Sequence, residues 1–310
     1  MKLYRMEEAN LRLNQDAEQF AAWAESVYDK QIEQTAKQIT RTAKERPVIL
    51  ISGPSGSAKT STALRLEQLL DNWGLETHTI SMDNYFKGNA EEGMPVDEDG
   101  NLDLESPQRL DITLLNQHLY QIARCEPVEI PSFDFSAQRR IENATPLHRR
   151  PGELVILEGI HALNPDVTGE SADFSTGIYV SVRTRVMDSS GALLHPEKIR
   201  LLRRLLRDSL YRGQSFVATI ARLKSVSRGE NLYIMPHKHR AQLSIDTFLP
   251  YELAVYRDEL LIGLEELGRS RLAQYGVTDV LDFLRQSSAF PKEAVPPHSI
   301  LREFIGEAGL

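Results

Sequence analysis

The sequence predicts an α/β fold in which helices cover both faces of a parallel five-stranded sheet. Short continuous apolar runs, such as 154–157, alternate along the chain with stretches of helical periodicity. Continuous apolar strands are typical of parallel sheets that are buried on both faces, and strands that alternate with helices are typical of layered α/β folds. A glycine- and serine-rich turn joins the first such strand to the first such helix. The predicted strands are 48–52, 76–82, 153–158, 176–182 and 243–248, and the predicted helices are 59–73, 107–124, 196–211, 215–228, 250–266 and 277–286.

The composition is that of an ordinary globular protein with an acidic balance. The 310 residues are 41% hydrophobic and 26% charged, and the formal net charge is −8. These values argue against a wholly disordered chain and against a protein that coats nucleic acid or an anionic membrane. The single cysteine, Cys125, excludes an intramolecular disulfide; with no signal peptide at the N-terminus, it predicts a reducing cytoplasmic setting. No apolar run approaches the roughly 20 residues that a membrane helix needs.

Residues 4–43 have the periodicity of one long helix. From Ala21 to Ala43 the apolar residues follow steps of three and four, which places them on one helix face. We expect this helix to pack on the body of the protein or on a second subunit. The sequence therefore predicts an N-terminal helical extension, a main domain and a C-terminal tail, with bounds 1–46, 47–286 and 287–310.

The segment 84–106 interrupts the alternation of strands and helices. A loop of this length inside a compact domain is typically functional or disordered. Its acidic residues are Glu91, Glu92, Asp97, Glu98, Asp99, Asp103 and Glu105.

The motif GPSGSAKT at residues 53–60 carries the strongest chemical signal. It follows a predicted strand and opens a predicted helix, which is the context that a phosphate-binding loop (P-loop) requires. Backbone N–H groups of such a loop and of the helix N-terminus surround the phosphates, while Lys59 reaches the β- and γ-phosphates and the Thr60 hydroxyl binds Mg²⁺. We therefore expect ATP and Mg²⁺ as cofactors. The residues assigned to ATP here are Gly53, Pro54, Ser55, Gly56, Ser57, Ala58, Lys59, Thr60 and Ser61.

One position of the loop departs from the usual pattern, because Ala58 stands where glycine normally precedes the lysine. A Cβ at this point lies where the backbone approaches the phosphates most closely, and it would weaken nucleotide binding. Alanine also favours the helix that starts there. This residue keeps open the alternative of a nucleotide-binding regulatory protein that has lost catalysis.

Two acids follow predicted strands. Asp83 comes after the second strand, and Glu158 ends the apolar strand 153–158 in the form of a Walker B element. Ligands of open parallel sheets gather at the carboxyl edge, where a carboxylate can accept a proton from an attacking hydroxyl. The sequence thus predicts a metal site that includes Thr60 and Glu158, with Asp83 beside it as a proton acceptor. The nearby His161 either contacts substrate or is a structural histidine.

A basic stretch lies at 198–212, with six lysines and arginines against the single acid Asp208. Taken alone, such a stretch is typical of a solvated helix face. Next to a phosphate-binding loop, it predicts a lid whose arginines neutralise charge on a transferred phosphoryl group.

Five motifs together resemble the uridine kinase/phosphoribulokinase family of P-loop kinases, and most closely its bacterial uridine kinase-like branch. The resemblance extends over about 47–265. It implies a P-loop NTPase three-layer fold of the nucleoside-kinase type, an arginine-rich lid at about 190–230, and transfer of the ATP γ-phosphate to a hydroxyl of a nucleoside such as uridine or cytidine. The motifs are GPSGSAKT (53–60), SMDNYF (81–86), PSFDF (131–135), LEGIHALNP (157–165) and RRLLRDSLYRG (203–213).

The resemblance also implies roles for individual residues. Asp83 matches the acid that activates the acceptor hydroxyl and helps to hold Mg²⁺, and Asp103 resembles the acid that binds ribose hydroxyls. Glu158 matches the Walker B acid. The implied catalytic residues are Lys59, Asp83, Arg204 and Arg207, with Arg203 and Arg212 beside the ATP phosphates. The implied substrate-binding residues are Asp83, Tyr85, Asp103, Phe133, Gln138 and His161.

Three positions depart from the family pattern. Phe133 replaces a tyrosine, Gln138 lies where a base-reading histidine is expected, and Gln214 replaces a basic residue. These departures leave open a kinase of another small hydroxylated metabolite, such as a sugar, a sugar phosphate, a glycerate or a pantothenate-like compound. The acidic loop disfavours a strongly anionic acceptor. We expect ATP and a small molecule as partners, with no nucleic acid and no membrane, and the sequence leaves formation of a homo-oligomer open.

Overall fold

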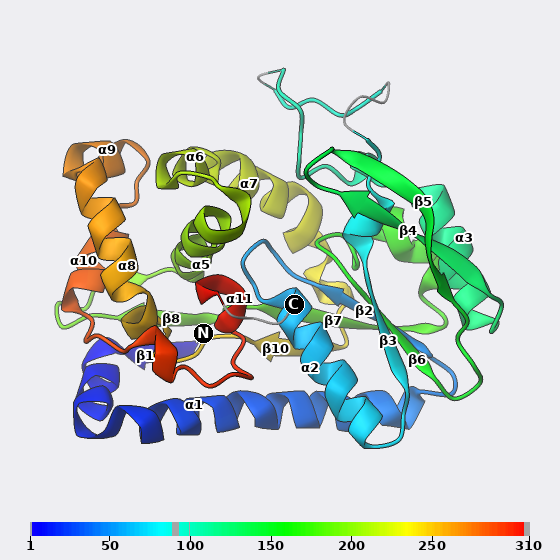
Figure 1. The fold of residues 1–310 in the computed structure, drawn as a ribbon, viewed down its shortest axis with the longest axis horizontal. Coiled ribbons are helices and arrows are strands. Elements are labelled where there is room, and N and C mark those ends of the chain that lie inside the picture. The colour runs from blue at the N-terminus through cyan, green and yellow to red at the C-terminus, as the bar shows by residue number, and fades with distance from the viewer. Residues whose placement is uncertain (1, 89–92, 99, 307–310) are drawn as a thin grey trace.

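The structure, a computed structural model, describes residues 2–88, 93–98 and 100–306. At its centre lies a sheet of five parallel strands in the order β10–β7–β2–β6–β3, with helices on both faces (Figure 1). The predicted α/β fold and its five-stranded parallel sheet are confirmed. The strands are β2 (Val48–Ser52), β3 (Thr77–Ser81), β6 (Leu154–Glu158), β7 (Ser175–Ser181) and β10 (Leu243–Asp246).

The helices lie close to their predicted bounds, with three differences. The helix predicted over 4–43 has a kink at Asp16, where φ is −159° and ψ is 94°. The predicted helix 107–124 becomes a short 3-10 turn followed by α3, because Asp111 caps the helix by accepting a hydrogen bond of 3.1 Å from the Leu114 N–H. The predicted helix 215–228 is split in two at Arg222. The helices are α1 (Met6–Thr42), α2 (Lys59–Asn72), α3 (Ile112–Ala123), α4 (Pro165–Thr168), α5 (Pro196–Arg212), α6 (Phe216–Ala221), α7 (Leu223–Gly229), α8 (Glu252–Leu267), α9 (Arg269–Gln274), α10 (Thr278–Gln286) and α11 (Arg302–Ile305).

Alternate residues of the strands feed two separate hydrophobic clusters. Ile49 and Ile51 of β2 join a cluster that includes residues of α1, α2, α5 and α8. Val48 and Leu50 join a second cluster with α3 and the strand β4 (Val128–Asp134). All five residues of β2 are buried, as expected for a strand covered on both faces.

The strand register brings the ends of three strands to one level. Glu158, the last residue of β6, pairs with Ile51 of β2 on one side and with Ser81 of β3 on the other. The segments that follow these strands therefore leave the sheet at the same edge. This register places the loop after Ser52, the acid Glu158 and the residues after Ser81 side by side.

The N-terminal helix packs on the body of its own chain. The helix α1 runs along one side of the molecule (Figure 1) and contributes Phe20, Ile32 and Ile39 to the first cluster. The Tyr28 hydroxyl lies 2.9 Å from the Thr62 hydroxyl of α2. Of the two expected positions for this helix, the structure shows the one on the body.

The segment 287–306 is an integral part of the core and does not form the separate tail that the sequence suggested. Phe290, Ile300, Leu301 and Phe304 are buried in the same cluster as the central sheet. The prolines of this segment prevent a long helix without preventing apolar burial.

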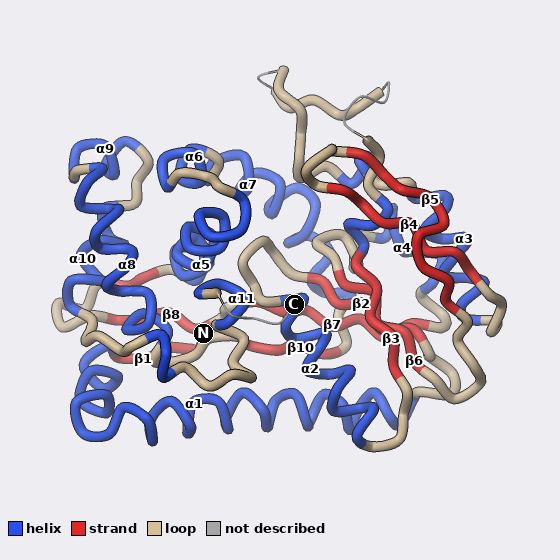
Figure 2. The backbone as a smooth tube through the Cα atoms, viewed as in Figure 1, coloured by secondary structure: helices blue, strands red, loops and turns tan. Residues whose placement is uncertain are grey.

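Two small sheets were not predicted. An antiparallel hairpin is formed by β4 and β5 (Arg139–Leu147), and a three-stranded sheet is formed by β1, β8 and β9 (Figure 2). Most of β5 is exposed, so its sequence lacks the apolar alternation that predicts a strand. The strands of the three-stranded sheet are β1 (Lys2–Arg5), β8 (Thr184–Met187) and β9 (Leu193–Leu194).

In the acidic segment 84–106, Phe86 bridges to Leu110 and Val96 bridges to Leu102. Within the described ranges, no helix combines the length and the apolar character needed to cross a membrane. Three acidic residues of this segment, Glu91, Glu92 and Asp99, lie outside the described residues. Residues 307–310 of the predicted tail also lie outside them.

Candidate active site

The loop 53–60 joins β2 to α2, as the motif predicted. Two of its glycines are required by close packing. A Cβ on Gly53 would lie 1.8 Å from the carbonyl oxygen of Val180, and Gly56 has a φ of +75° with the carbonyl oxygen of Arg200 only 2.7 Å from where a Cβ would stand. Any larger residue at either position would displace the neighbouring backbone. The loop is thus held tightly between β7 and α5.

Ala58 adopts the left-handed conformation, with a φ of 64° and a ψ of 39°. Non-glycine residues pay about 1–2 kcal/mol for this conformation. Ala58 is 1% exposed and belongs to the first hydrophobic cluster. Because a methyl group that faced an open phosphate site would be accessible to solvent, this burial indicates that the Ala58 methyl is directed into the core.

Two of the residues predicted to bind Mg²⁺, Thr60 and Glu158, meet at the N-terminal end of α2. The Thr60 hydroxyl donates a hydrogen bond of 3.2 Å to Glu158, and Lys59 donates one of 3.4 Å to the carbonyl oxygen of Pro54. Burial raises the pKa of Glu158 to about 7, and the nearby Lys59 ammonium opposes this shift. A hydroxyl and carboxylates beside one another are the oxygen donors that Mg²⁺ takes, so these residues fit the ion.

Asp83 stands in the 3-10 turn that follows β3 and is half-buried. Burial raises the pKa of its carboxyl, while the charges of Lys59, Arg212, Arg109 and Arg207 oppose the rise. Asp83 also raises the pKa of Glu158. The structure therefore brings together the two predicted acids and a group of cations around them.

Arg203, predicted beside the ATP phosphates, is fully buried. Its guanidinium forms a bidentate ion pair with Glu252, with distances of 2.8 and 3.1 Å, and donates to the carbonyl oxygens of Thr247 and Gly56 at 2.7 and 3.3 Å. Both hydrogen-bonding edges of the guanidinium are thus engaged with protein atoms. In this arrangement Arg203 joins the phosphate-binding loop, at Gly56, to Glu252 of α8.

The other predicted arginines also lie on α5. Arg204 is buried, and its side chain reaches the carbonyl oxygen of Thr219 at 3.5 Å. Arg207 and Arg212 share the carboxylate of Asp208, with shortest distances of 2.8 and 3.5 Å. Arg207 and Arg212 both lower the pKa of the Asp83 carboxyl. Their positive charges therefore act on the candidate active site.

Asp103 is buried, and both oxygens of its carboxylate accept hydrogen bonds from neighbours. Its Oδ2 accepts from Arg228 at 2.8 Å and from the Tyr233 hydroxyl at 3.1 Å, and its Oδ1 accepts from the Glu105 N–H at 3.1 Å. Sequence reasoning missed Arg228 and Tyr233, which lie at the end of α7 and in the π-helical turn that follows it. A helix continued through residues 223–234 with a π turn is typical of functional sites, but the sequence pattern gave no sign of that turn.

His161 lies near the same group and is 1% exposed. Neither of its ring nitrogens makes a hydrogen bond of good geometry among the described residues, although the Glu105 backbone lies close enough to raise the pKa of the ring. The ring packs edge-on to Tyr233 at 6.1 Å. Burial lowers the pKa of His161 to about 4, whereas burial raises the pKa of Glu105 to about 7. The buried ring nitrogens of His161 are therefore only weakly satisfied by the described residues.

The remaining predicted substrate residues lie further apart. Tyr85 is buried and its hydroxyl lies 3.0 Å from Nδ1 of His118 on α3. Phe133 is buried on β4, and Gln138 lies in the hairpin turn with its amide donating to the carbonyl oxygen of Phe135 at 2.6 Å. Tyr85 and Gln138 thus have hydrogen bonds to different segments, α3 and the hairpin turn.

Phe133 belongs to an aromatic group that sequence reasoning identified only in part. Its ring packs edge-on to Phe86 at 5.7 Å and to Phe135 at 5.1 Å. The guanidinium of Arg109 lies 4.5 Å from the Phe86 ring centroid. Burial lowers the pKa of Arg109, and the negative charge of Asp83 opposes this shift. Arg109 therefore links the aromatic group to Asp83, and nothing in its sequence context singles it out.

Ser61, the last residue assigned to ATP, is already paired with an acid from the C-terminal segment. Its hydroxyl donates a hydrogen bond of 2.5 Å to Oε2 of Glu303, and its backbone N–H lies 3.4 Å from the same oxygen. No sequence signal pointed to Glu303, because the segment was predicted as a tail.

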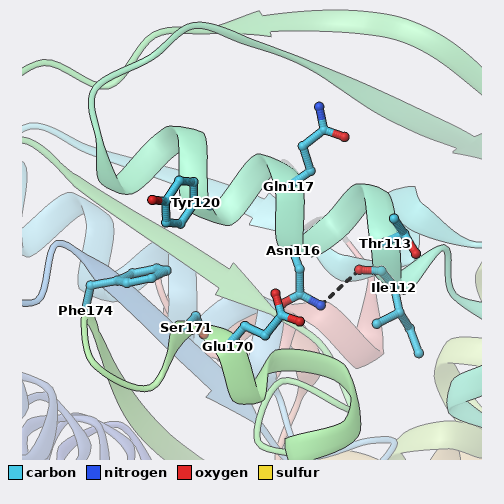
Figure 3. Close-up of a pocket in the computed structure, with 8 residues that line it drawn as sticks. All are labelled: Ile112, Thr113, Asn116, Gln117, Tyr120, Glu170, Ser171 and Phe174. Atoms are coloured by element: carbon cyan, nitrogen blue, oxygen red, sulfur yellow. Dashed lines mark hydrogen bonds between the residues drawn. The ribbon is translucent and has the colours of Figure 1, made fainter.

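A cavity of about 380 Å³ lies elsewhere, between α3 and the turn after α4 (Figure 3). Asn116 lines it and donates to the carbonyl oxygens of Ile112 and Val167 at 3.0 and 2.8 Å. None of the catalytic, binding or metal-site residues predicted from the sequence lines this cavity, so it is separate from the candidate active site.

Known proteins resemble this chain over its central two thirds. Residues 48–252 match the model of the Phosphoribulokinase / Uridine kinase family. Uridine kinase of Lactobacillus helveticus (strain DPC 4571) is 30% identical over 204 residues, which cover 65% of this chain and 87% of that protein. Uridine kinase of Lactobacillus johnsonii is 31% identical over 205 residues, with the same coverage of 65% and 87%.

One solved structure supports the fold. The crystal structure of a candidate fructose transport system kinase from Silicibacter sp. TM1040 has a TM-score of 0.53 and 20% sequence identity, and the match covers 69% of this chain and 98% of that chain. At this identity the likeness concerns the fold alone.

Proposed function

Because the chain belongs to the phosphoribulokinase/uridine kinase family, we propose that it transfers the γ-phosphate of ATP to a hydroxyl group of a nucleoside of the uridine or cytidine type. The observation that carries this proposal is the meeting of Lys59, Thr60, Glu158 and Asp83 at one edge of the sheet. Phosphoryl transfer depends on positioning and on electrostatic stabilisation. Cations and carboxylates in one place supply both.

Each of the converging residues has a separate task in this proposal. The N–H groups of the loop 53–60 and the Lys59 ammonium hold phosphate oxygens. Thr60, Glu158 and Asp83 hold Mg²⁺, which neutralises charge on the phosphates when it is bound. Asp83 accepts the proton of the acceptor hydroxyl.

The arginines of α5 divide into two groups. Arg207 and Arg212 lie where their charges reach Asp83, and we assign to them, with Arg204, the stabilisation of charge during transfer. Arg203 holds the loop through Gly56 and Glu252. Because Arg203 and the backbone of Arg200 pack α5 against the loop, the moving part of the predicted lid in this proposal is α6 and α7, whose closure over bound substrates excludes water.

The aromatic group near Asp83 supports a nucleoside as the acceptor. Phe133 packs edge-on to both Phe86 and Phe135, and Phe135 is 55% exposed. Aromatic side chains stack on bases of any sequence. Asp103 and His161, which lie close to Tyr233, are proposed to contact the ribose hydroxyls.

A second acceptor class is favoured by Phe133 and Gln138. The Gln138 amide is engaged by the Phe135 carbonyl oxygen in the hairpin turn, and a phenyl ring at Phe133 has no hydroxyl to offer to a base. The second candidate is therefore another small hydroxylated metabolite, such as a sugar, a glycerate or a pantothenate-like compound. The alternative of a regulatory protein without catalysis loses support from the buried methyl of Ala58.

The experiment that tests the proposal measures ADP release by the purified protein with Mg·ATP and a panel of acceptors. The panel contains uridine, cytidine, adenosine, a hexose, glycerate and pantothenate. We expect ADP release to depend on an added nucleoside. Release with a sugar or a carboxylic acid alone would select the second candidate, and nucleotide binding without release in any arm would favour the regulatory alternative.

A further inference from the structure

Glu303 occupies the N-terminal end of α2. Its Oε2 accepts a hydrogen bond of 2.5 Å from the Ser61 hydroxyl and lies 3.4 Å from the Ser61 backbone nitrogen. Ser61 is the third residue of α2, and the residue before the helix, Ala58, has no side-chain oxygen to cap it. The C-terminal helix α11 thus supplies an acid to a helix start that lacks its own cap.

The same helix start is the place where the proposed function requires a phosphate. The first N–H groups of a helix have no partner within the helix, and together with the helix dipole they attract anions. A carboxylate oxygen and a phosphate oxygen accept the same kind of hydrogen bond from such groups. Glu303 therefore holds donors that belong to the predicted ATP site.

The position of Glu303 is fixed by the burial of its neighbours. Leu301 and Phe304 are fully buried, and the guanidinium of Arg203 lies 5.2 Å from the Phe304 ring centroid. Arg203 in turn reaches the carbonyl oxygen of Gly56 in the phosphate-binding loop. The helix α11 is thereby linked to the loop 53–60 in two ways, through Arg203 to Gly56 in its middle and through Glu303 to Ser61 just after it.

The charge of Glu303 extends to the other acids of the site. It contributes to the raised pKa of Glu158, and it also raises the pKa of Arg203, which favours the charged guanidinium. A phosphate bound at Ser61 would face this carboxylate at close range, where like charges repel. A bound nucleotide and Glu303 in its present place are therefore in competition.

We propose that Glu303 occupies a phosphate-binding position of the nucleotide-free protein and that ATP or ADP displaces it, so that α11 moves away from α2 when nucleotide binds. This inference rests on the proposed function. It makes the C-terminal segment, which lies outside the family match of 48–252, a determinant of nucleotide affinity in this chain.

The first test compares two isosteric variants. Glu303→Gln keeps the shape of the side chain and removes its charge, and Glu293→Gln makes the same change at an exposed position of the same segment. Titration of Mg·ADP into each protein by calorimetry gives the dissociation constant without any need for turnover. We expect Glu303→Gln to bind Mg·ADP about 5- to 10-fold more tightly, because a neutral amide oxygen competes for the Ser61 donors more weakly than a carboxylate does, and Glu293→Gln to bind it like the wild type.

The outcomes separate the two ideas. Binding by all three proteins with equal or weaker affinity in Glu303→Gln would overturn the displacement and leave Glu303 as a helix cap only. The absence of Mg·ADP binding in all three would overturn the proposed function, and the displacement with it.

A second measurement detects the movement itself. The N–H groups of Phe304 and Ile305 both donate to the carbonyl oxygen of Leu301, so their hydrogen exchange reports on α11. We expect saturating Mg·ADP to accelerate exchange at 301–305 in the wild-type protein. Exchange that is unchanged or slowed by Mg·ADP would contradict displacement.

Discussion

The hydroxyl of Thr60 and the carboxylate of Glu158 lie 3.2 Å apart although 98 positions separate them in the chain. The parallel pairing of β2 with β6 creates this contact, because Ile51 is in register with Glu158 and the loop that leads to Thr60 begins just after Ile51. The proposed metal site thus depends on strand register as much as on the residues themselves. A shift of β6 by one residue would turn Glu158 to the other face.

Replacement of Lys59 by alanine is expected to abolish most activity. Lys59 is the only side-chain cation in the loop 53–60, and its removal should lower turnover by at least about 10²-fold with the fold intact. ADP release and thermal unfolding measure the two effects. Lys224→Ala, at an exposed position of α7, is the control, and near-normal turnover of Lys59→Ala would refute the phosphate-binding assignment.

Replacement of Ala58 by glycine is expected to change little. Glycine relieves about 1 kcal/mol of left-handed strain but loses a buried methyl worth about 0.8 kcal/mol, so the free energy of unfolding should stay nearly constant. Because the methyl is buried away from solvent, ATP affinity should stay within about twofold, or about 0.4 kcal/mol. A titration of ATP against both proteins checks this, and a tenfold gain in the glycine variant would show that the methyl crowds the phosphates.

Replacement of Asp83 by asparagine is expected to act on turnover. Asparagine keeps the shape of the side chain but cannot take the proton of the acceptor, so kcat should fall by roughly 10²–10⁴-fold while ATP still binds. Acceptor-dependent ADP release and a separate nucleotide titration give the two quantities. Asp97→Asn, in the acidic loop, serves as control, and normal ADP release by Asp83→Asn would contradict its role as base.

Replacement of Asp103 by asparagine is expected to act on acceptor binding. Arg228 and Tyr233 hold the Asp103 carboxylate, and loss of this arrangement should raise the acceptor KM about tenfold or more with a smaller effect on kcat. Tyr233→Phe removes one hydrogen bond to the same oxygen and should raise KM less. Steady-state kinetics decide the matter, and an unchanged KM for every acceptor in the panel would exclude Asp103 from the acceptor site.

The buried Glu25 predicts a pH dependence of stability. Its carboxyl accepts a hydrogen bond of 2.5 Å from the Tyr251 hydroxyl, and burial raises its pKa, against hydrogen bonds from Ser299 and Tyr251 and the charge of His298. The folded protein then holds a proton that the unfolded chain has lost, so the free energy of unfolding falls as pH rises above about 4.3, the usual pKa of glutamate.

Urea unfolding of wild type and Glu25→Gln across this pH range measures the effect. The variant should lose less stability than the wild type as pH increases, because its amide does not titrate. Glu18→Gln, at an exposed position of the same helix, should follow the wild type. Parallel curves for Glu25→Gln and wild type would contradict the assignment.

Sequence reasoning placed the central sheet, the phosphate-binding loop and most helices correctly, because these elements carry strong local signals. The continuous apolar run of β6 and the motif GPSGSAKT are examples. It missed β5, whose side chains are mostly exposed, and the burial of Phe304 in a segment that contains several prolines.

The site residues that were missed share one physical property, since their roles arise only from long-range contacts. Arg109 matters because it stacks on Phe86 near Asp83, and Glu303 because it reaches Ser61. Neither contact follows from periodicity or local motif. Arg203 shows the converse, because a predicted phosphate ligand proves to be buried against Glu252.

The contact between Ser61 and Glu303 spans 242 positions, which has a consequence for the order of events during synthesis. The chain is synthesised from its N-terminus, so β2, α2 and the loop between them are made long before α11 exists. A nascent chain at that stage presents the unpaired N–H groups of α2 without the carboxylate that later covers one of them. Nucleotide bound at this stage would stabilise the growing sheet by mass action, and the newly made C-terminal segment would then have to pack around an occupied site.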